Sequence, residues 1–400
     1  MVLIIKYSLI VILLSLSINI IAQKNALIVG KIEYDKGLYN LTIASLDEYI
    51  AEKQSVNEAI IIRGKAKLNL QEYSGAIEDF SKINLKKFPE LNLFLARAYA
   101  GVNNENETIY HLENYLKLKM KLPEEEIIAY PEFGNIADSK EWEELWAEKW
   151  YSKKEILLQK AKGELSISNY QAAESYLNEY IIKYNGNAHV FFLKAKLSII
   201  RNNDKEALDY LDRAIGLENN VKFSIIKGET EFRLKKYKKS LKTFNEAFLN
   251  DSLNLQIPYG RSIVYSALKK DDLAKADIKK YLYYYPEEVE GIVRFAKINQ
   301  ASGDFLAAIQ TYGKLIEKYP ANIEYYKERA NAFMQTHTYM YAIKDYSMAL
   351  DLYPWDAEIY FQKGNAHFQL KQVQKACTDW KRAQKYGSIE SQKLIYKYCR

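Results

Sequence analysis

Residues 323–356 read IEYYKERANAFMQTHTYMYAIKDYSMALDLYPWD, and three kinds of residue in this stretch recur every 34 residues. The recurring prolines, three of the seven in the chain, are Pro286, Pro320 and Pro354. The recurring alanines, in phase with them, are Ala274, Ala308, Ala342 and Ala376. The recurring aromatic residues are Tyr312, Tyr346 and Trp380. A fixed period of this length is typical of stacked helix–turn–helix units, so the sequence predicts an all-α solenoid.

Packing explains these residue types. Two antiparallel helices approach closely only where small residues face each other, and bulky residues fill the space between one helix pair and the next. A proline after the second helix cannot continue that helix and fixes the turn into the next unit. A single pair cannot bury its apolar face alone, so several pairs must stack. The composition agrees, because 48% of the 400 residues are apolar and only 16 are Gly and 7 Pro.

The pattern resembles the tetratricopeptide repeat. Its first helix, helix A, has a bulky residue at position 4, a large one at 7, a small one at 8 and an aromatic at 11. Its second helix, helix B, has Ala at 20, an aromatic at 24, Ala at 27 and often Pro at 32. The unit that starts at Ile323 matches at Tyr326, Arg329, Ala330, Phe333, Ala342, Tyr346, Ala349 and Pro354. Other units start at Gln23, Asn57, Pro89, Lys154, Ala188, Val221, Leu255, Val289 and Ala357.

The resemblance implies a right-handed α-solenoid of about ten such helix pairs. It implies three repeats at 23–117, seven more at 154–387 and a C-terminal capping helix at 388–400. Three residues depart from the alanine expected at position 20, namely Thr42, Thr108 and Ser240, and Tyr281 departs at position 27. The flanking repeats preserve the spacing despite these departures.

The first 22 residues lie outside the repeats and predict a signal peptide. Lys6 supplies a positive start, residues 7–21 form an apolar run broken only by Ser and Asn19, and a cleavage point fits after Ala22. The alternative is an uncleaved membrane anchor, because residues 2–22 are about long enough to span a bilayer. Either interpretation places the repeats outside the cytoplasm, in the periplasm or at the cell surface. Membrane contact is expected only if this segment is retained.

Residues 118–153 interrupt the repeats with an acidic insertion that we expect to be helical. Between residues 123 and 149 there are nine acidic and two basic residues. Asp138 with Glu141 is a capping-box start for a helix. That helix would carry three tryptophans at four-residue spacing, Trp142, Trp146 and Trp150. They either seal the insertion against neighbouring repeats or form an exposed anchor for a partner, and sealing is favoured because three exposed tryptophans would form a large apolar patch.

The opposite charge gathers between residues 220 and 280, which contain fourteen basic and seven acidic residues. The densest run, at the turn between helices A and B of one repeat, is Arg233, Lys235, Lys236, Lys238, Lys239 and Lys242. Such a run is either a solvated helix face or a site for an anionic partner, such as a wall polymer, a lipid headgroup or an acidic protein. Nucleic acid is not expected as a partner, because a net charge of +6 over 400 residues supports it only weakly.

Catalytic chemistry leaves no recognisable pattern in the sequence. The histidines, His111, His189, His337 and His367, are far apart and lack metal-ligand spacing. No GxSxG, HExxH or phosphate-cradling glycine loop occurs. We therefore expect no enzyme activity, no catalytic or metal site and no cofactor.

The family resemblance implies that helix A residues at positions 2, 5, 9 and 12 line a concave face that binds a protein or peptide. Positions 5 and 9 of four repeats give Tyr259, Ile263, Val293, Lys297, Lys327, Asn331, Phe361 and Asn365 as candidates. Lys327 and Asn331 also match the first repeat of a clamp for a peptide's C-terminal carboxylate. That clamp is incomplete, because no third repeat with the second Lys and an Arg follows.

Residues 376–399 resemble the tails of exported tetratricopeptide proteins from Bacteroidota, which supports export. The shared elements are Ala376-Cys377, Asp379-Trp380, Gly387 and Tyr398-Cys399. Cys377 and Cys399 are the only two cysteines, and two helices that fold back about Gly387 would bring them to similar height. The sequence therefore predicts a disulfide between them, against the alternative of a buried Cys377 and a free Cys399 thiol.

Two classes of function stay open. The first is a non-enzymatic scaffold that holds a protein or peptide partner in the cell envelope. The second is a structural subunit of a larger envelope assembly, such as a secretion, motility or surface complex.

Overall fold

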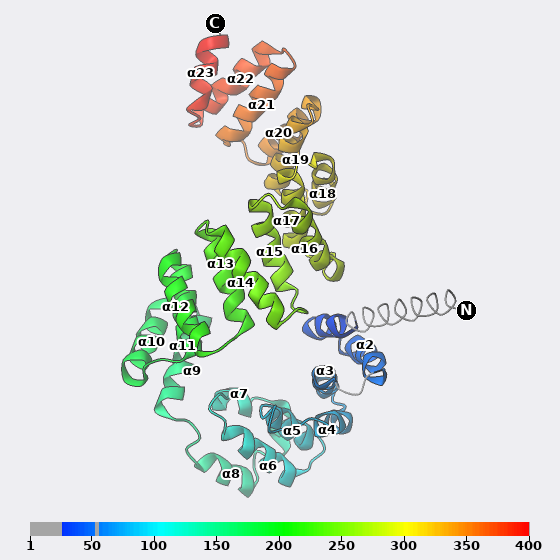
Figure 1. Cartoon of the computed structure of the whole chain (residues 1–400), viewed down its shortest axis with the longest axis vertical. Helices are drawn as coiled ribbons and strands as arrows, with labels where there is room; N and C mark the ends of the chain where they lie inside the picture. Colours follow the sequence, from blue (N-terminus) through cyan, green and yellow to red (C-terminus); the bar gives the residue numbers. More distant parts are fainter. Residues whose placement is uncertain (1–25, 53–55, 400) are drawn as a thin grey trace, which may run out of the picture. The chain divides into compact units, whose positions relative to one another are not determined.

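The computed structural model describes residues 26–52 and 56–399. Within these ranges every regular element is a helix and no strand occurs (Figure 1). The predicted all-α solenoid of tetratricopeptide-like helix pairs is therefore confirmed. The chain forms two compact units, of which unit 1 ends at Glu218 and unit 2 begins at Asn219. The predicted signal segment, residues 1–22, lies outside the described residues.

Unit 1 contains helix pairs on either side of the insertion. A helical segment at 26–35 and α2 (Tyr39–Ala51) come first. The next two pairs are α3 (Asn57–Asn69) with α4 (Tyr73–Ser81) and α5 (Leu91–Gly101) with α6 (Glu105–Leu116). The insertion forms α7 (Glu124–Ile128), the 3₁₀ helix η1 (Pro131–Asn135) and α8 (Lys140–Ala147). The last pairs are α9 (Lys153–Ser166) with α10 (Tyr170–Tyr184) and α11 (Ala188–Ile200) with α12 (Asp204–Leu217).

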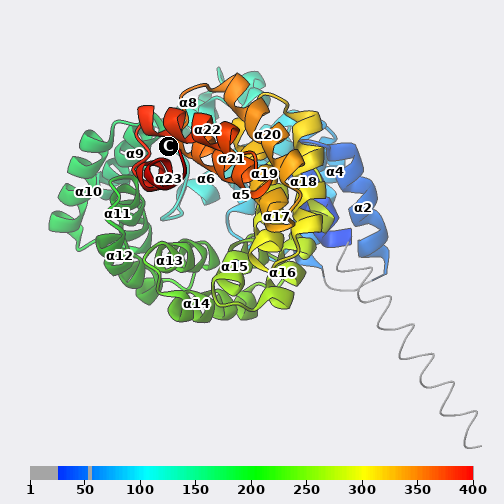
Figure 2. The ribbon, with the colours of Figure 1, turned by 90° about the horizontal axis from the view of Figure 1, so that it is seen from above.

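Unit 2 contains a further series of pairs and a final single helix. The first three pairs are α13 (Val221–Arg233) with α14 (Tyr237–Asn250), α15 (Gln256–Ala267) with α16 (Asp271–Tyr284), and α17 (Val289–Ala301) with α18 (Phe305–Lys318). The others are α19 (Ile323–Gln335) with α20 (Tyr339–Leu352) and α21 (Ala357–Gln369) with α22 (Val373–Lys385), followed by α23 (Glu390–Tyr398). Within this unit, Figure 2 shows α13, α15 and α17 on the inner side of the curve and α14, α16 and α18 on the outer side.

Close approach of helices A and B explains the small residues at positions 8 and 20. A Cβ atom added at Gly364, position 8 of its repeat, would lie only 2.5 Å from the Trp380 ring of helix B. Opposite it, the position-20 alanine Ala376 is completely buried. The three departures from alanine at position 20 satisfy their hydroxyl groups through main-chain carbonyls. Ser240, for example, donates to the Gly228 oxygen at 2.7 Å, so a polar atom is buried there without being left unbonded.

The turn between helices A and B has the same backbone conformation throughout the described residues. Position 15 of each predicted repeat has a positive φ, and the residues are Gly37, Gln71, Asn103, Ser168, Asn202, Lys235, Lys269, Gly303, His337 and Lys371. At the last of them, the Lys371 amide donates to the Phe368 oxygen and the Gln372 amide donates to the His367 oxygen, both at 2.9 Å. This paired bonding is the Schellman motif, which satisfies the last carbonyls of helix A.

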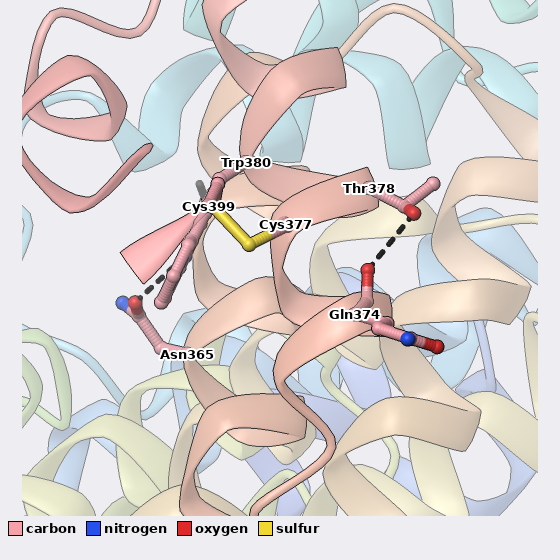
Figure 3. Close-up of a disulfide and its surroundings, with 6 residues drawn as sticks. All are labelled: Asn365, Gln374, Cys377, Thr378, Trp380 and Cys399. Carbon is pink, nitrogen blue, oxygen red and sulfur yellow. Dashed lines mark hydrogen bonds between the residues drawn. A yellow bond between two sulfur atoms is a disulfide. The ribbon is translucent and has the colours of Figure 1, made fainter. Parts of the chain in front are cut away.

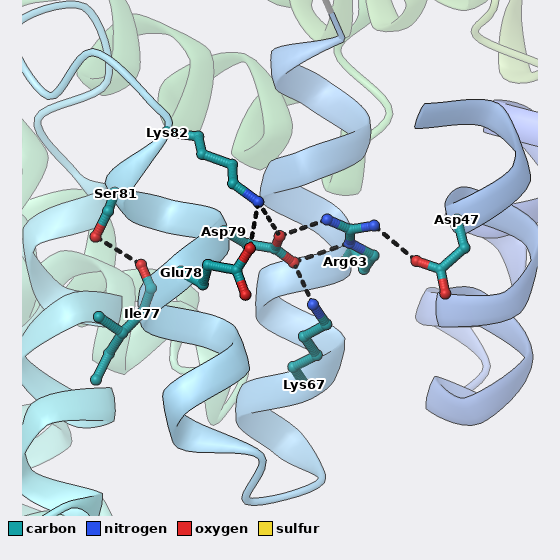
Figure 4. Close-up of polar contacts among 8 residues, drawn as sticks. All are labelled: Asp47, Arg63, Lys67, Ile77, Glu78, Asp79, Ser81 and Lys82. Carbon is teal, nitrogen blue, oxygen red and sulfur yellow. Dashed lines mark hydrogen bonds and ion pairs between the residues drawn. The ribbon is translucent and has the colours of Figure 1, made fainter. Parts of the chain in front are cut away.

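A buried ion pair joins helix A to helix B in several repeats. A cation at position 7 meets an aspartate at position 23, sixteen residues later, in Arg63–Asp79, Arg261–Asp277, Arg329–Asp345 and Lys363–Asp379. Asp79 is fully buried, and Figure 4 shows Arg63 of α3 between this carboxylate and Asp47 of the preceding repeat. The two-pronged guanidinium geometry fixes the relative height of the two helices. The sequence contains this pattern, but only Arg329 was noted there, as a large residue at position 7.

The insertion packs onto the preceding helix pair. Phe133 and Trp142 are buried in one apolar cluster with residues of α5 and α6, so Trp142 seals the insertion as favoured above. Trp146 and Trp150 are half-buried against the same cluster. The cap of α8 differs from the expected one. Ser139, not Asp138, accepts the helix-starting amide of Trp142, and Trp150 lies beyond the end of α8.

The insertion is also held by polar contacts on both sides. On the N-terminal side, Arg97 of α5 pairs with Glu132 at 2.8 Å and lies 4.0 Å from the centre of the Tyr130 ring. On the C-terminal side, Lys121 pairs with Glu155 of α9 at 2.7 Å. Arg97 occupies position 9, one of the positions that the sequence predicts for a concave binding face, so the insertion covers part of the predicted face at this repeat.

The C-terminal helix is joined to the last pair by a disulfide. Cys377 of α22 and Cys399, directly after α23, are bonded with their Cα atoms 5.6 Å apart (Figure 3). The Tyr398 ring packs on the Phe368 ring with centroids 4.6 Å apart, so the helix also covers apolar surface of α21. The last repeat is thereby closed by a covalently attached cap.

Candidate functional site

The residues predicted for the concave face lie in pairs on four helices of unit 2. Tyr259 and Ile263 are on α15, Val293 and Lys297 on α17, Lys327 and Asn331 on α19, and Phe361 and Asn365 on α21. Members of each pair are four residues apart and therefore share one helix face. We call the surface that they form with α13 the A-helix face. Lys297 is exposed, whereas the other seven are half-buried, so little of their polar surface is open to a partner.

The two asparagines are occupied within their own repeats. The Asn331 side-chain oxygen accepts a hydrogen bond from the Tyr346 hydroxyl at 2.7 Å. The Asn365 oxygen accepts one from the Trp380 ring nitrogen at 3.1 Å (Figure 3). Lys327 pairs with Glu358 of α21 at 2.8 Å. The residues that resemble a carboxylate clamp are thus engaged in internal contacts. Each asparagine accepts a hydrogen bond from a buried aromatic side chain, whose polar group would otherwise have no partner.

The part of the A-helix face that α13, α15 and α17 form contains a cavity. A cavity of about 220 Å³ lies between α13, α15 and α17 and is lined by Glu229, Phe232, Arg233, Phe244, Gly260, Ile263 and Arg294. We call it the Glu229 cavity. Its volume is of the size of one amino-acid side chain. The predicted residue Ile263 forms part of its wall, and Tyr259 supports one of its charged groups.

Arg294 is held in place by Tyr259. The guanidinium carbon of Arg294 lies 3.6 Å from the centre of the Tyr259 ring, and its Nη1 donates to the Tyr259 main-chain oxygen at 2.6 Å. The Tyr259 ring in turn packs against Tyr281, with centroids 4.6 Å apart. Burial lowers the pKa of Arg294, but a guanidinium remains charged at any physiological pH. The cavity therefore contains a fixed positive charge with donors beyond the one already used.

Glu229 supplies the opposite charge. Burial raises the pKa of this carboxyl group, and the charges of Arg233 and Arg294 oppose that shift. Among the described residues Glu229 has no hydrogen-bond partner, and no cationic nitrogen lies within 4.0 Å of its carboxylate. Its neighbour Glu231, in contrast, accepts a hydrogen bond from the Thr243 hydroxyl at 2.7 Å. Glu229 is therefore a partly desolvated acceptor that an incoming group could satisfy.

Sequence reasoning missed most of this cavity. Glu229 and Phe232 occupy positions 9 and 12 of the repeat that starts at Val221, so the positional rule would have found them had it been applied one repeat earlier. Arg294 is at position 6, which the rule does not include. Its placement depends on how α17 packs against α15, and no signal in the sequence shows that.

The basic run lies at a different part of unit 2, around the turn from α13 to α14. Its members are exposed, and they are Arg233, Lys235, Lys236, Lys238, Lys239 and Lys242. The following repeat adds Lys269 and Lys270 at the equivalent turn positions. Only Arg233 also lines the Glu229 cavity, where its Nη2 donates to the Thr230 hydroxyl at 3.0 Å.

The described residues offer neither a metal site nor a membrane-spanning helix. Across residues 26–52 and 56–399, no group of three or more His, Cys, Asp or Glu side chains is placed to hold a metal ion. In the same part of the chain, no helix is both long and apolar enough to cross a membrane.

Comparison with known proteins supports the fold. No family model and no curated protein matches the sequence. A tetratricopeptide repeat protein from Parabacteroides merdae aligns with 62% of this chain and 99% of its own, with 18% identity and a TM-score of 0.50. The type IV pilus biogenesis factor PilW aligns with 52% of this chain and 97% of its own, with 14% identity and a TM-score of 0.48. The first alignment shows that this chain has the tetratricopeptide-repeat fold.

Proposed function

We propose that this protein is a non-enzymatic scaffold of the cell envelope that holds a protein or peptide partner on the A-helix face of unit 2. The observation that carries the proposal is the Glu229 cavity. It lies on the inner side of stacked A helices and combines apolar walls with two charged groups that have unused hydrogen-bonding capacity. Sites that bind side chains of a partner have this composition.

A scaffold role also fits the way in which the other charged groups are used. Asp79, Asp277 and Asp345 are buried in ion pairs that join helix A to helix B. Repeat solenoids of this kind use extended concave surfaces for binding, with stability supplied by contacts between neighbouring repeats. Binding on this face would therefore leave these ion pairs within the repeats undisturbed.

The location in the cell envelope is proposed on two grounds. The apolar segment at residues 1–22 has the composition of a signal peptide. The bond between Cys377 and Cys399 belongs to a class that persists in oxidising compartments and is rare in the reducing cytosol. Intact-mass analysis of the protein from its native cells tests this part, because export with cleavage removes about 22 residues.

Site-specific photocrosslinking in native cells tests the binding face. A photoreactive amino acid at Lys297, which is exposed on α17 within the A-helix face, should yield one dominant covalent adduct. The matched control is Leu249, which is 84% exposed on α14 and lies on the outer side. An adduct from Lys297 but not from Leu249 supports the proposal.

Two other results would argue against it. Equal adducts from both positions, with neighbours that co-purify in a fixed ratio, would favour the alternative of a structural subunit in an envelope assembly. An adduct from Leu249 alone would move the binding site to the outer side of unit 2.

A further inference from the structure

The charges around the Glu229 cavity define what it can accept. Two positive groups, Arg294 and Arg233, and one negative group, Glu229, line it. Glu288 adds a second negative charge next to Arg294, but its Oε2 already accepts the Gly291 amide at 2.5 Å and caps α17. Arg233 is exposed at the rim, where solvent partly screens its charge, although that charge still lowers the pKa of Glu229 together with Arg294. Glu229 and Arg294 are the half-buried charged groups of the lining, so a side chain inside the cavity meets their charges with the least screening.

A charged ligand would meet one favourable and one unfavourable contact there. A lysine or arginine side chain would pair with Glu229 but be repelled by Arg294. A carboxylate would pair with Arg294 but be repelled by Glu229. In a partly desolvated site, such repulsion is not screened as it is in water. A purely apolar side chain would avoid repulsion, yet it would bury both polar groups without partners, and that also weakens binding.

A neutral group that donates on one side and accepts on the other avoids both penalties. A primary carboxamide has an NH₂ group that can donate to the Glu229 carboxylate and an oxygen that can accept from Arg294. The apolar walls at Phe232, Phe244 and Ile263 suit the methylene groups that carry such an amide. The volume of about 220 Å³ admits one side chain and excludes a folded segment.

We infer that the Glu229 cavity is a specificity pocket for a carboxamide side chain, glutamine or asparagine, of the partner. This inference rests on the proposed function, since it names the residue type that the A-helix face selects. The Glu229 carboxylate accepts from the amide nitrogen, Arg294 donates to the amide oxygen, and Tyr259 keeps the guanidinium in position.

Blocked pentapeptides of the form acetyl-Ala-Ala-X-Ala-Ala-amide test the inference with the purified full-length protein. X is Gln, Asn, Glu, Lys or Leu, and binding is measured by ligand-observed NMR titration. The Gln or Asn peptide should bind at least about tenfold more tightly than the other three, the factor expected when a mismatched ligand leaves one buried polar group unpaired. Equal affinities, or a preference of the wild type for Glu, Lys or Leu, would overturn the inference.

Reciprocal variants give a sharper test. Glu229→Gln removes the negative charge and should shift the preference towards the Glu peptide. Arg294→Gln removes the positive charge and should shift it towards the Lys peptide. Arg294→Lys keeps the charge and should retain the carboxamide preference, which shows that an effect of Arg294→Gln is not simply lost packing on Tyr259. Leu249→Ala, on α14 and outside the cavity lining, is the control that should leave the preference unchanged.

The two proposals fail separately. The peptide titration needs no native partner, so loss of selectivity in it overturns the pocket assignment even if crosslinking from Lys297 succeeds. A selective pocket together with no adduct from Lys297 would instead overturn the scaffold role and keep the pocket.

Discussion

The Tyr346 hydroxyl, on a ring that is fully buried between helices A and B, donates to the side-chain oxygen of Asn331 at 2.7 Å. Trp380 and Asn365 form the same kind of contact one repeat later, at 3.1 Å. The asparagine at position 9 therefore accepts a hydrogen bond from the core of its own repeat. Its amide nitrogen donates to a side chain on the same helix, at 3.5 Å from Asn331 to Glu328 and at 3.3 Å from Asn365 to Gln362.

This contact predicts a stability effect for Asn331. Asn331→Leu leaves the Tyr346 hydroxyl without its acceptor and should lower the free energy of unfolding by about 1–3 kcal/mol. Adding Tyr346→Phe removes the hydroxyl and should recover most of the loss. Denaturant titration of the two single variants and the double variant measures the coupling. If the loss in the double variant equals or exceeds the sum of the two single losses, Asn331 acts through something other than this hydrogen bond.

Breaking the ion pair between Arg329 and Asp345 should lower the stability of the fold more than breaking an ion pair on the surface. Asp345 is 3% exposed and accepts from Arg329 Nε and Nη2 at 2.7 and 2.8 Å. Asp345→Asn should cost about 3–5 kcal/mol, because it leaves a guanidinium without its partner in a buried site. Glu287→Gln, which breaks the exposed pair with Lys318, should cost far less, because solvent screens the attraction between two exposed side chains. Similar midpoints of thermal unfolding for the two variants would contradict this ranking.

Replacing glycine by alanine should have opposite effects on stability at Gly303, in a left-handed turn, and at Gly313, inside a helix. Gly303 has φ +78°, and an added Cβ atom would meet nothing within 4 Å, so Gly303→Ala isolates the backbone cost of about 1 kcal/mol. Gly313 lies within α18, where an added Cβ atom has only an ordinary contact at 3.6 Å. Gly313→Ala should stabilise by up to about 1 kcal/mol. Unfolding midpoints that shift in the same direction would refute the conformational explanation.

Asp379 predicts a pH dependence of stability in the last repeat. Burial raises the pKa of Asp379 above its ordinary value of 3.8, although Lys363 and His367 lie 3.6 Å away and oppose the shift. A raised pKa means that the folded state holds the proton more tightly than the unfolded state. The resulting stability is fully present below the ordinary pKa and is lost as the pH rises through the folded-state pKa.

The comparison of wild type with Asp379→Asn isolates this contribution. Relative to the variant, the wild type should lose stability as the pH rises from roughly 3 to above the folded-state pKa of Asp379. Denaturant titrations across this range measure the difference. A difference that stays constant, or one that grows in favour of the wild type, would show that the neighbouring cations outweigh burial.

The bond between Cys377 and Cys399 predicts no free thiols in protein purified from its native cells and measured under denaturing, non-reducing conditions. The bond closes a loop with a sequence separation of 22, which corresponds to about 3 kcal/mol in the chain-entropy model. Cys377→Ala with Cys399→Ala should therefore loosen α23 and speed proteolysis around Gly387. Two titratable thiols per chain, or unchanged proteolysis of the double variant, would count against this role.

The sequence predicted the repeats well because their packing residues are periodic. Six A helices, α3, α11, α13, α17, α19 and α21, begin at the residues where repeats were expected to start. Features that depend on contact between repeats were not predicted. The Arg294 side chain reaches the Glu229 cavity only because α17 packs beside α15, and position 6 carries no periodic signal for it. The cap of α8 was wrong by one residue, since Asp138 and Ser139 are both good capping residues and only local geometry selects between them.

At position 15 of each repeat, the turn requires a left-handed backbone but no particular side chain. The turn's bonds run between main-chain atoms, and the side chains at this position are exposed throughout the described residues. In unit 1 they are uncharged, whereas in unit 2 three of them are lysines, Lys235, Lys269 and Lys371. The charge at position 15 can therefore change without any change in the packing of the core. A lineage of such chains can gain or lose attraction for anions by single substitutions that leave every helix pair intact.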